Sequence, residues 1–306
     1  MLNRERKEAF VEYQSTQYSG TNLEAFKKKM LKHFVVIEAT EDALGKDVCE
    51  FSADEIKDVL EKSYKNYSSA KDCLRAMRLY TKWCTGNGYC PENKSYDIVS
   101  ASDINCSQKQ AESLFPGYNA FSDYLSKRFR PLDEMSIDNI TRAVCWLLYF
   151  GVDMEDLGKI RNADYSNGVV NIGRTIIDLS AYPEARESLD TLASQTVIRK
   201  KKGFEDIRDT PRLIKYNLAS KTLARTFVCY LGKINEDQRR EGVECVSTAC
   251  IIKSGLFWRM KRADDDTAAM MATRYIYGHY HSSDKVMKFQ MKQLTKAYRA
   301  WVGTSE

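Results

Sequence analysis

The chain has 306 residues, enough for two domains that each have their own hydrophobic core. Hydrophobic residues make up 43% and charged residues 29%, which is ordinary for a soluble globular chain, and no apolar run approaches the roughly 20 residues that a helix needs to cross a bilayer. The formal net charge of +5 does not by itself identify a nucleic-acid partner, so the clustering of the basic residues must decide.

The nine cysteines are odd in number and form no Cys-x-x-Cys pair. Several lie in apolar helical patterns, namely Cys73, Cys84, Cys145 and Cys229. We therefore expect reduced core thiols in a cytoplasmic protein, without disulfides, metal ligands or a cofactor. The charged N-terminus lacks the apolar segment of a signal peptide.

Residues 1 to about 130 show mainly helical patterns. Helices are predicted over Arg4–Gln14 and Asn22–Glu38, and Ser52-Ala-Asp-Glu55 is a capping box that starts a helix ending near Lys62. The second helix carries an apolar stripe at steps of three and four residues, formed by Leu23, Phe26, Met30, Phe34 and Ile37.

The next predicted helix, Ala70–Cys84, is capped by Ser68 or Ser69 and stops before Gly88. At about 100° per residue, four basic side chains fall in an arc about 60° wide. These residues, which we call the basic ridge, are Lys71, Arg75, Arg78 and Lys82. A separate, core-facing arc holds Ala70, Leu74, Met77, Tyr80, Thr81 and Cys84. A basic ridge of this kind suits duplex DNA, although a solvated charged face gives the same pattern.

Turn signals concentrate between residues 90 and 117, so we expect an N-terminal domain over residues 1–117 and a C-terminal domain over residues 118–306. The second domain begins with helices over Asn119–Arg128 and from Ser136 to Gly151. Two β-rich runs, Val169–Ile172 and Thr175–Leu179, then predict a hairpin around Gly173-Arg174, and a further helix begins at Pro183.

Basic residues recur in the C-terminal half. The densest run is Arg199-Lys-Lys-Lys-Gly203, for which a solvated loop is an equally good interpretation. A helix capped by Ser220 runs to Leu231 and carries Lys221 and Arg225 one turn apart. Arg212 and Lys215, just before that helix, suit phosphate contacts.

The last third predicts three helices. The first spans Ser247–Met260, and the second follows an acidic break, Asp264–Asp266, which is more typical of a helix cap than of a metal site. The final helix, from Asp284, has a stripe formed by Met287, Met291, Leu294, Tyr298 and Trp301. We expect this stripe to pack on its own domain, with docking on a second protomer as the alternative.

The last third of the chain has two predicted helices separated by a polar break and followed by Gly278-His279. This order resembles the closing part of the catalytic domain in tyrosine recombinases, the phage-integrase family. The segment Ala70–Tyr89 resembles the last long helix of their core-binding domain, on Leu74, Leu79, Trp83 and Gly88. The resemblance implies a mainly α, two-domain clamp on duplex DNA. It also implies that the helix carrying Lys221 and Arg225 reads bases in the major groove.

The resemblance implies in addition that the catalytic chemistry has been lost. Asp153 stands where the family has an arginine, Arg174 is the basic residue nearest the position of its lysine, and Lys288 replaces the nucleophilic tyrosine. Ala249 and Ile252 occupy the places of the His-x-x-Arg pair, and only His279 matches. A carboxylate at 153 would repel the phosphate that the reaction must grip, so we expect no strand cleavage.

The pattern is similar to the integrase-like master repressors of SPbeta-type temperate phages, which hold lysogeny by occupying operator repeats. It implies a non-enzymatic repressor that binds double-stranded operator DNA, with a homodimer through the C-terminal helix as an option. One alternative is a recombinase whose nucleophile has moved, for example to Tyr280 or Tyr298, and another is a scaffold that binds protein. The predicted DNA contacts are Lys71, Arg75, Arg78, Lys82, Arg174, Arg199, Lys200, Lys201, Lys202, Arg212, Lys215, Lys221, Arg225, Lys253 and His279.

Overall fold

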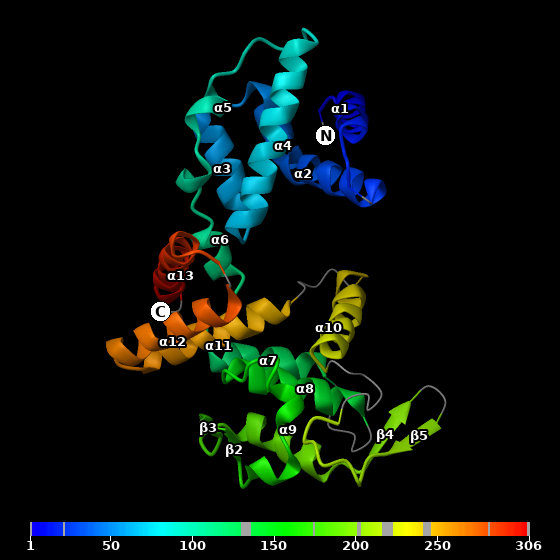
Figure 1. Cartoon of the computed structure of the whole chain (residues 1–306), viewed down its shortest axis with the longest axis vertical. Coiled ribbons are helices and arrows are strands. Elements are labelled where there is room, and N and C mark those ends of the chain that lie inside the picture. Colours follow the sequence, from blue (N-terminus) through cyan, green and yellow to red (C-terminus); the bar gives the residue numbers. More distant parts are fainter. Residues whose placement is uncertain are drawn as a thin grey trace. The chain divides into compact units, whose positions relative to one another are not determined.

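A computed structural model describes residues 2–20, 22–129, 136–173, 175–200, 203–215, 223–240, 246–280 and 282–304 (Figure 1). The chain divides into two compact units. The N-terminal unit comprises Met1–Ser113 with Lys292–Ala300, and the C-terminal unit comprises Leu114–Met291 with Trp301–Glu306. The described residues are mainly helical, as the sequence predicts, and they form two small antiparallel sheets where one was expected.

The four helices expected in the N-terminal unit are present as α1 (Arg4–Thr16), α2 (Leu23–Leu44), α3 (Ala53–Ser63) and α4 (Tyr67–Gly86). Two short helices that were not predicted, α5 (Ser95–Ile98) and α6 (Ser107–Glu112), lie where only turns were expected. The capping box before α3 is confirmed, because the Glu55 amide donates to Ser52 Oγ at 3.2 Å and the Ser52 amide donates to the Glu55 carboxylate at 2.8 Å. Helix α2 continues past its predicted end, since Gly45 in the left-handed conformation provides the stop.

Helix α4 begins one turn earlier than predicted. Asn66 caps it, accepting a hydrogen bond from the Ser69 amide at 2.8 Å, so the expectation of a cap at Ser68 or Ser69 was wrong. The predicted core face of this helix is confirmed, because its members are all buried: Ala70, Leu74, Met77, Tyr80, Thr81 and Cys84. Burial of that face fixes which side of α4 looks outward, and it is the side that carries the basic ridge.

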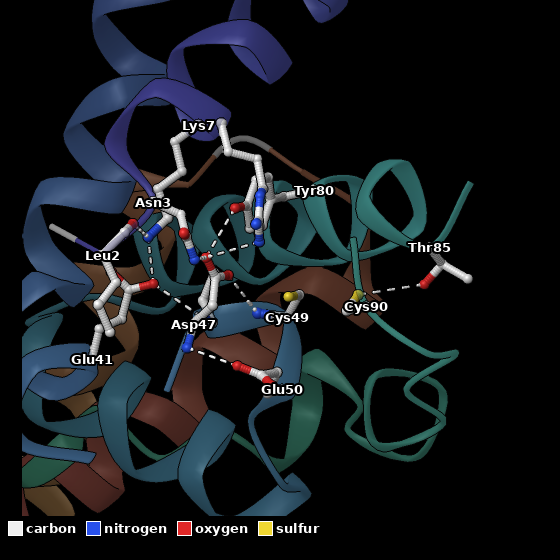
Figure 2. Close-up of polar contacts among 12 residues, drawn as sticks. Leu2, Asn3, Lys7, Glu41, Asp47, Cys49, Glu50, Tyr80, Thr85 and Cys90 are labelled. Atoms are coloured by element: carbon white, nitrogen blue, oxygen red, sulfur yellow. Dashed lines mark hydrogen bonds and ion pairs between the residues drawn. The ribbon is translucent and has the colours of Figure 1, made fainter. Parts of the chain in front are cut away.

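A buried polar network holds α1 against the rest of the N-terminal unit (Figure 2). The Lys7 ammonium is fully buried, pairs with Glu41 of α2 and donates to the Leu2 carbonyl at 2.8 Å. Asp47 accepts hydrogen bonds from the side-chain amide of Asn3 at 2.7 Å and from the Tyr80 hydroxyl at 3.1 Å. These bonds compensate for taking the charges out of water, and they tie the N-terminus to α4.

The C-terminal unit is built around a central helix, α8, whose residues from Asn139 to Tyr149 are all buried. Ser136 caps it as predicted. The remaining helices are α7 (Tyr118–Arg128), α8 (Ile137–Tyr149), α9 (Pro183–Ser194), α10 (Leu223–Arg240), α11 (Thr248–Arg262), α12 (Asp265–His279) and α13 (Asp284–Thr304). The cap interpretation of the acidic break is confirmed, because Asp264 accepts from the Thr267 amide at 2.8 Å at the start of α12.

Helices α8 and α11 approach each other at Gly255. A Cβ atom at this position would lie 1.9 Å from the Tyr149 carbonyl oxygen, so only glycine fits the crossing. One residue earlier, Ser254 Oγ accepts from the Phe115 amide at 2.9 Å, and the Phe115 carbonyl accepts from Trp301 Nε1 at 3.0 Å. Both main-chain groups of Phe115 are therefore held by side chains from much later in the chain.

The predicted hairpin is confirmed as part of a three-stranded antiparallel sheet in the order β1-β2-β3. Its strands are β1 (Tyr165–Ser166), β2 (Val169–Ile172) and β3 (Thr175–Asp178). A second hairpin, which was not predicted, pairs β4 (Val197–Lys200) with β5 (Gly203–Asp206) on either side of the basic run. The successive lysines conceal the alternation that would have indicated strands, because their side chains give the same pattern on either face.

Other expectations meet the structure in different ways. In α13, Met287, Leu294 and Trp301 are buried, which agrees with packing within the chain. Residues Lys292–Ala300 of this helix belong to the N-terminal unit, so the expectation that the whole stripe packs on the C-terminal domain was wrong. The described cysteines are free thiols, and Cys73, Cys84 and Cys145 are buried as expected. Cys229 is exposed, so its assignment to the core was wrong; it lies off the face of α10 that buries Phe227 and Leu231. Among the described helices, none is long and apolar enough to span a membrane.

Candidate nucleic-acid interface

The basic ridge lies on the outer side of α4, and its members differ in availability. Lys71, Arg75 and Lys82 are exposed, whereas Arg78 is half-buried. The Arg78 guanidinium donates to the Tyr96 carbonyl at 2.9 Å and also to the Val99 carbonyl. Arg78 therefore fastens the segment after α5 onto α4, and its predicted role as a freely placed phosphate contact must be revised.

Acidic side chains lie near the C-terminal half of the ridge. A pocket of about 510 Å³ beside α4 is lined by Arg78 and Lys82 and also by Glu92 and Asp97. These carboxylates offset the local positive potential. Less negative charge offsets the N-terminal half of the ridge, because the Asp72 carboxylate pairs with the Lys29 ammonium at 2.8 Å. Lys71 and Arg75 thus form its more strongly basic part, a distinction that the helical wheel does not reveal.

In the C-terminal unit, the structure places some predicted contacts and leaves others outside the described residues. Arg199 is exposed on β4 and Arg212 is exposed beside Arg161, with which it forms an isolated antiparallel bridge. For Lys200 in β4 and Arg225 in α10 only the backbone is described. The positions outside the described residues are Arg174, Lys201, Lys202 and Lys221.

Lys215 does not suit the phosphate contact proposed for it. Its side chain is buried, and its ammonium donates to the Gln195 carbonyl at 2.8 Å and more weakly to the Ala193 carbonyl at 3.4 Å. Burial also lowers the pKa of Lys215. This lysine connects the segment before α10 to the end of α9, and the earlier expectation is corrected accordingly.

Lys253 lies on α11, one turn after Cys250, and is half-exposed. Burial of its side chain lowers the pKa of its ammonium to about 8, and the nearby Cys250 side chain acts in the opposite direction. The side chain is therefore still mainly charged at pH 7, and it can contribute to anion binding only below the pH at which it loses its proton.

Two arginines lie near the carboxylate at position 153. Asp153 pairs with Arg274 of α12 at 3.6 Å, and both side chains are more than half exposed. Arg259 of α11 packs across Gly151 and donates to the Tyr149 carbonyl at 2.7 Å. Burial lowers the pKa of Arg259 to about 10, while Tyr149 and Asp153 oppose that shift. Neither arginine was identified from the sequence, because both lie outside the family's catalytic motifs.

The other positions of the catalytic pattern carry no paired acid and base among the described side chains. Ile252 packs against the main hydrophobic core, Ala249 is exposed near the start of α11, and Lys288 is exposed on α13. His279 is exposed; its Nδ1 lies 2.9 Å from the Tyr275 carbonyl, and its ring stacks on Tyr275 with centroids 4.2 Å apart. This histidine is therefore held by its own helix.

Residues 1–86 match the family model described as MrpR, N-terminal core-binding domain. The matched segment contains α1, α2, α3 and the whole of α4, including the basic ridge. The match supports a DNA-binding domain of the tyrosine-recombinase type in the N-terminal part of the chain. No curated protein sequence matches the chain.

Proposed function

We propose that this chain is a sequence-specific duplex-DNA-binding protein that does not cleave its target, and that it acts as a repressor at phage operator sites. The observation that carries the proposal is the coincidence of two features in residues 1–86. That segment matches a core-binding domain, and its last helix presents Lys71 and Arg75 to solvent. Exposed cations on a helix that can approach the duplex supply the phosphate contacts on which affinity depends.

The C-terminal unit would complete a clamp, with residues 1–117 and 118–306 as the two DNA-binding domains. Base reading stays assigned to Lys221 and Arg225, and phosphate contacts to the surface cations Arg199, Arg212 and Lys253. The loss of cleavage rests on the identity of the residues at the catalytic positions, above all the carboxylate of Asp153. A protein that occupies its site without cutting it suits a repressor, with a homodimer through α13 as the arrangement to be examined.

The first experiment measures binding and its dependence on salt. Purified protein is used to retain fragments of genomic DNA, and a recovered duplex is titrated by fluorescence anisotropy at several salt concentrations. We expect affinity to fall steeply with ionic strength. We also expect Lys71→Ala with Arg75→Ala to weaken every duplex by about tenfold and to reduce the salt slope by roughly two. A flat salt response would instead favour a scaffold that binds protein.

A second candidate, a recombinase with displaced catalytic residues, draws on one observation: Arg259 and Arg274 both lie near Asp153. A nicked suicide duplex separates the candidates, because an active tyrosine stays joined to the DNA after the cut. We expect no covalent adduct. An adduct that disappears on Tyr280→Phe or Tyr298→Phe would show that the chain cleaves DNA. Burial raises the pKa of Tyr280, which makes its phenol a poorer nucleophile.

A further inference from the structure

Three cysteine side chains of the N-terminal unit gather where α4 ends. Cys49 lies in a short 3₁₀ turn, Val48–Glu50, and Cys84 lies in the last turn of α4. Cys90 follows that helix, and Figure 2 shows it together with Cys49. The Cys49 thiol is close enough to hydrogen-bond with the thiols of both Cys84 and Cys90. All three are free thiols, so the structure shows the cluster in its reduced state.

The backbone holds the segment of Cys90 against the turn that carries Cys49. Gly88 has φ +72°, a left-handed conformation that lets the chain reverse after α4. Three residues beyond Cys90, the Asn93 side chain donates to the Cys49 carbonyl at 2.9 Å and to the Phe51 carbonyl at 2.8 Å. A covalent bond between the two sulfurs would therefore join segments that already touch.

The three thiols differ in access to solvent. Cys49 and Cys84 are 1% and 0% exposed, whereas Cys90 is only half-buried. The Thr85 hydroxyl lies 3.7 Å from the Cys90 sulfur, where it can donate a hydrogen bond to a thiolate. A small oxidant that arrives from solvent therefore meets Cys90 first, and Cys49 lies behind it as the thiol that can react next.

The thiols of Cys49 and Cys84 share a proton unequally. Their hydrogen bond lowers the pKa of Cys84, an effect that burial opposes, and it raises the pKa of Cys49, an effect that burial strengthens. The proton between them thus stays on Cys49, with Cys84 as the acceptor. Cys49 can pass this proton to Cys84 when its own sulfur forms a new bond.

We propose that this cluster is a site of reversible thiol oxidation, at which hydrogen peroxide converts Cys90 and Cys49 into an intramolecular disulfide. Peroxide first transfers one oxygen atom to the Cys90 sulfur, which yields a sulfenic acid and water. The Cys49 sulfur then displaces the hydroxyl group, which leaves with the Cys49 proton as a second water. In total the two thiols lose two electrons, and one peroxide is reduced to two waters. An added dithiol returns the disulfide to thiols by exchange.

The disulfide would change the stability of the N-terminal unit. It closes a loop between positions 49 and 90 that contains α3 and α4. Such a cross-link restricts the unfolded chain more than the folded one, so we expect the melting temperature of the oxidised protein to rise by at least about 5 °C. Dithiothreitol should restore the lower value. This inference does not depend on the proposed function, because it concerns the chain without DNA.

The test maps the linkage in the whole chain. Reduced protein is treated with a small molar excess of hydrogen peroxide, the remaining thiols are blocked with iodoacetamide, and peptides are analysed by mass spectrometry without reduction. We expect a linked peptide pair that contains Cys49 and Cys90. Cys229→Ser is the matched control, because it removes an exposed thiol on α10 and should leave the linkage unchanged. Cys90→Ser should abolish both the linkage and the rise in melting temperature.

A second variant traps the intermediate. In Cys49→Ala the sulfenic acid has lost its partner, so dimedone, which reacts with sulfenic acids, should label Cys90 more strongly than in the natural protein. If Cys49→Ala does not fold, Cys90→Ser still decides the question, because Cys90 is only half-buried and the change is small. A linkage between Cys49 and Cys84 would overturn the assigned pair. Oxidation confined to Cys229, with Cys90 unmodified, would overturn the site.

Discussion

Two ion pairs, one in each unit, combine the same kinds of groups under opposite conditions. Lys7 and Glu41 in the N-terminal unit are both 0% exposed, whereas the side chains of Arg274 and Asp153 in the C-terminal unit are 66% and 53% exposed. The buried pair must be satisfied inside the fold, because water cannot reach it. The exposed pair is screened by water and can be exchanged for a bound anion.

This difference separates charges that build the fold from charges that face a partner. Burial raises the pKa of Glu41, although the ammonium of Lys7 and the amide of Val48 both act in the opposite direction. Solvation, rather than the distance between the charged atoms, therefore decides what such a pair contributes. The same distinction divides the basic ridge, where Arg78 is tied to main-chain carbonyls and Arg75 is exposed.

The largest effect should follow from breaking the buried pair. Glu41→Ala leaves the Lys7 ammonium without its partner in the core, and we expect it to lower the free energy of unfolding by about 3–5 kcal/mol. Urea denaturation followed by circular dichroism measures the loss. Lys7→Met combined with Glu41→Leu should recover much of it, because two apolar side chains replace the pair. A loss below about 1 kcal/mol in Glu41→Ala would remove the contrast between the two pairs.

A smaller effect should distinguish two arginines of the same ridge. Arg78→Ala deprives two carbonyls of a charged donor, so we expect it to reduce the free energy of unfolding by roughly 1.5–3 kcal/mol. Arg75→Ala should leave that free energy within about 0.5 kcal/mol of the natural value and instead weaken all duplexes alike. Thermal melts and DNA titrations on both variants check this division. Equal losses of stability would show that the ridge is uniform.

The pH dependence of DNA binding tests whether Lys253 contacts the DNA. Its folded-state pKa of about 8 lies below its ordinary value of 10.5, so the unfolded chain holds this proton more strongly. The contribution of this group to stability therefore rises with pH between those values. Its charge is lost over the same range, and DNA affinity should fall by roughly threefold more between pH 7 and 9 in the natural protein than in Lys253→Arg. Parallel pH profiles would exclude Lys253 from the interface.

The smallest effect on stability is expected at Asp153. Because both partners are exposed, Asp153→Asn should change the free energy of unfolding by less than about 1 kcal/mol. Asp156→Asn is the matched control, since Asp156 pairs with Lys159 at 2.7 Å on the same surface segment and its loss changes the charge equally. If Arg274 lies on the DNA side, Asp153→Asn should tighten binding more than Asp156→Asn. Identical titrations would place Arg274 away from the DNA.

The sequence predicts those parts of the fold that depend on local patterns. The apolar stripe of α2, the Ser52–Glu55 box and the core face of α4 all rest on residues within a few turns of one another. The roles of Lys7, Arg78 and Lys215 could not be predicted in this way, because their partners lie 34, 18 and 20 residues away and a lysine or arginine side chain normally faces water.

The features of the candidate site also fall into those that local sequence patterns predict and those that depend on packing between distant segments. The position of the ridge follows from helical periodicity, and the charge at 153 follows from the resemblance to recombinases. The acids near Lys82 and the arginines beside Asp153 depend on packing between segments distant in the sequence. A one-dimensional pattern contains no information on which side chains meet there.

The double fastening of Phe115 has a consequence for synthesis on the ribosome. Its amide depends on Ser254, 139 positions later, and its carbonyl on Trp301, 186 positions later. While translation proceeds, the first residues of the C-terminal unit must stay hydrated at both groups, and they reach their final pairing only when the last helix has emerged. Closure of this unit is thus a late event that waits for the last helix, whereas residues 1–86 can begin to fold as soon as α4 has left the exit tunnel.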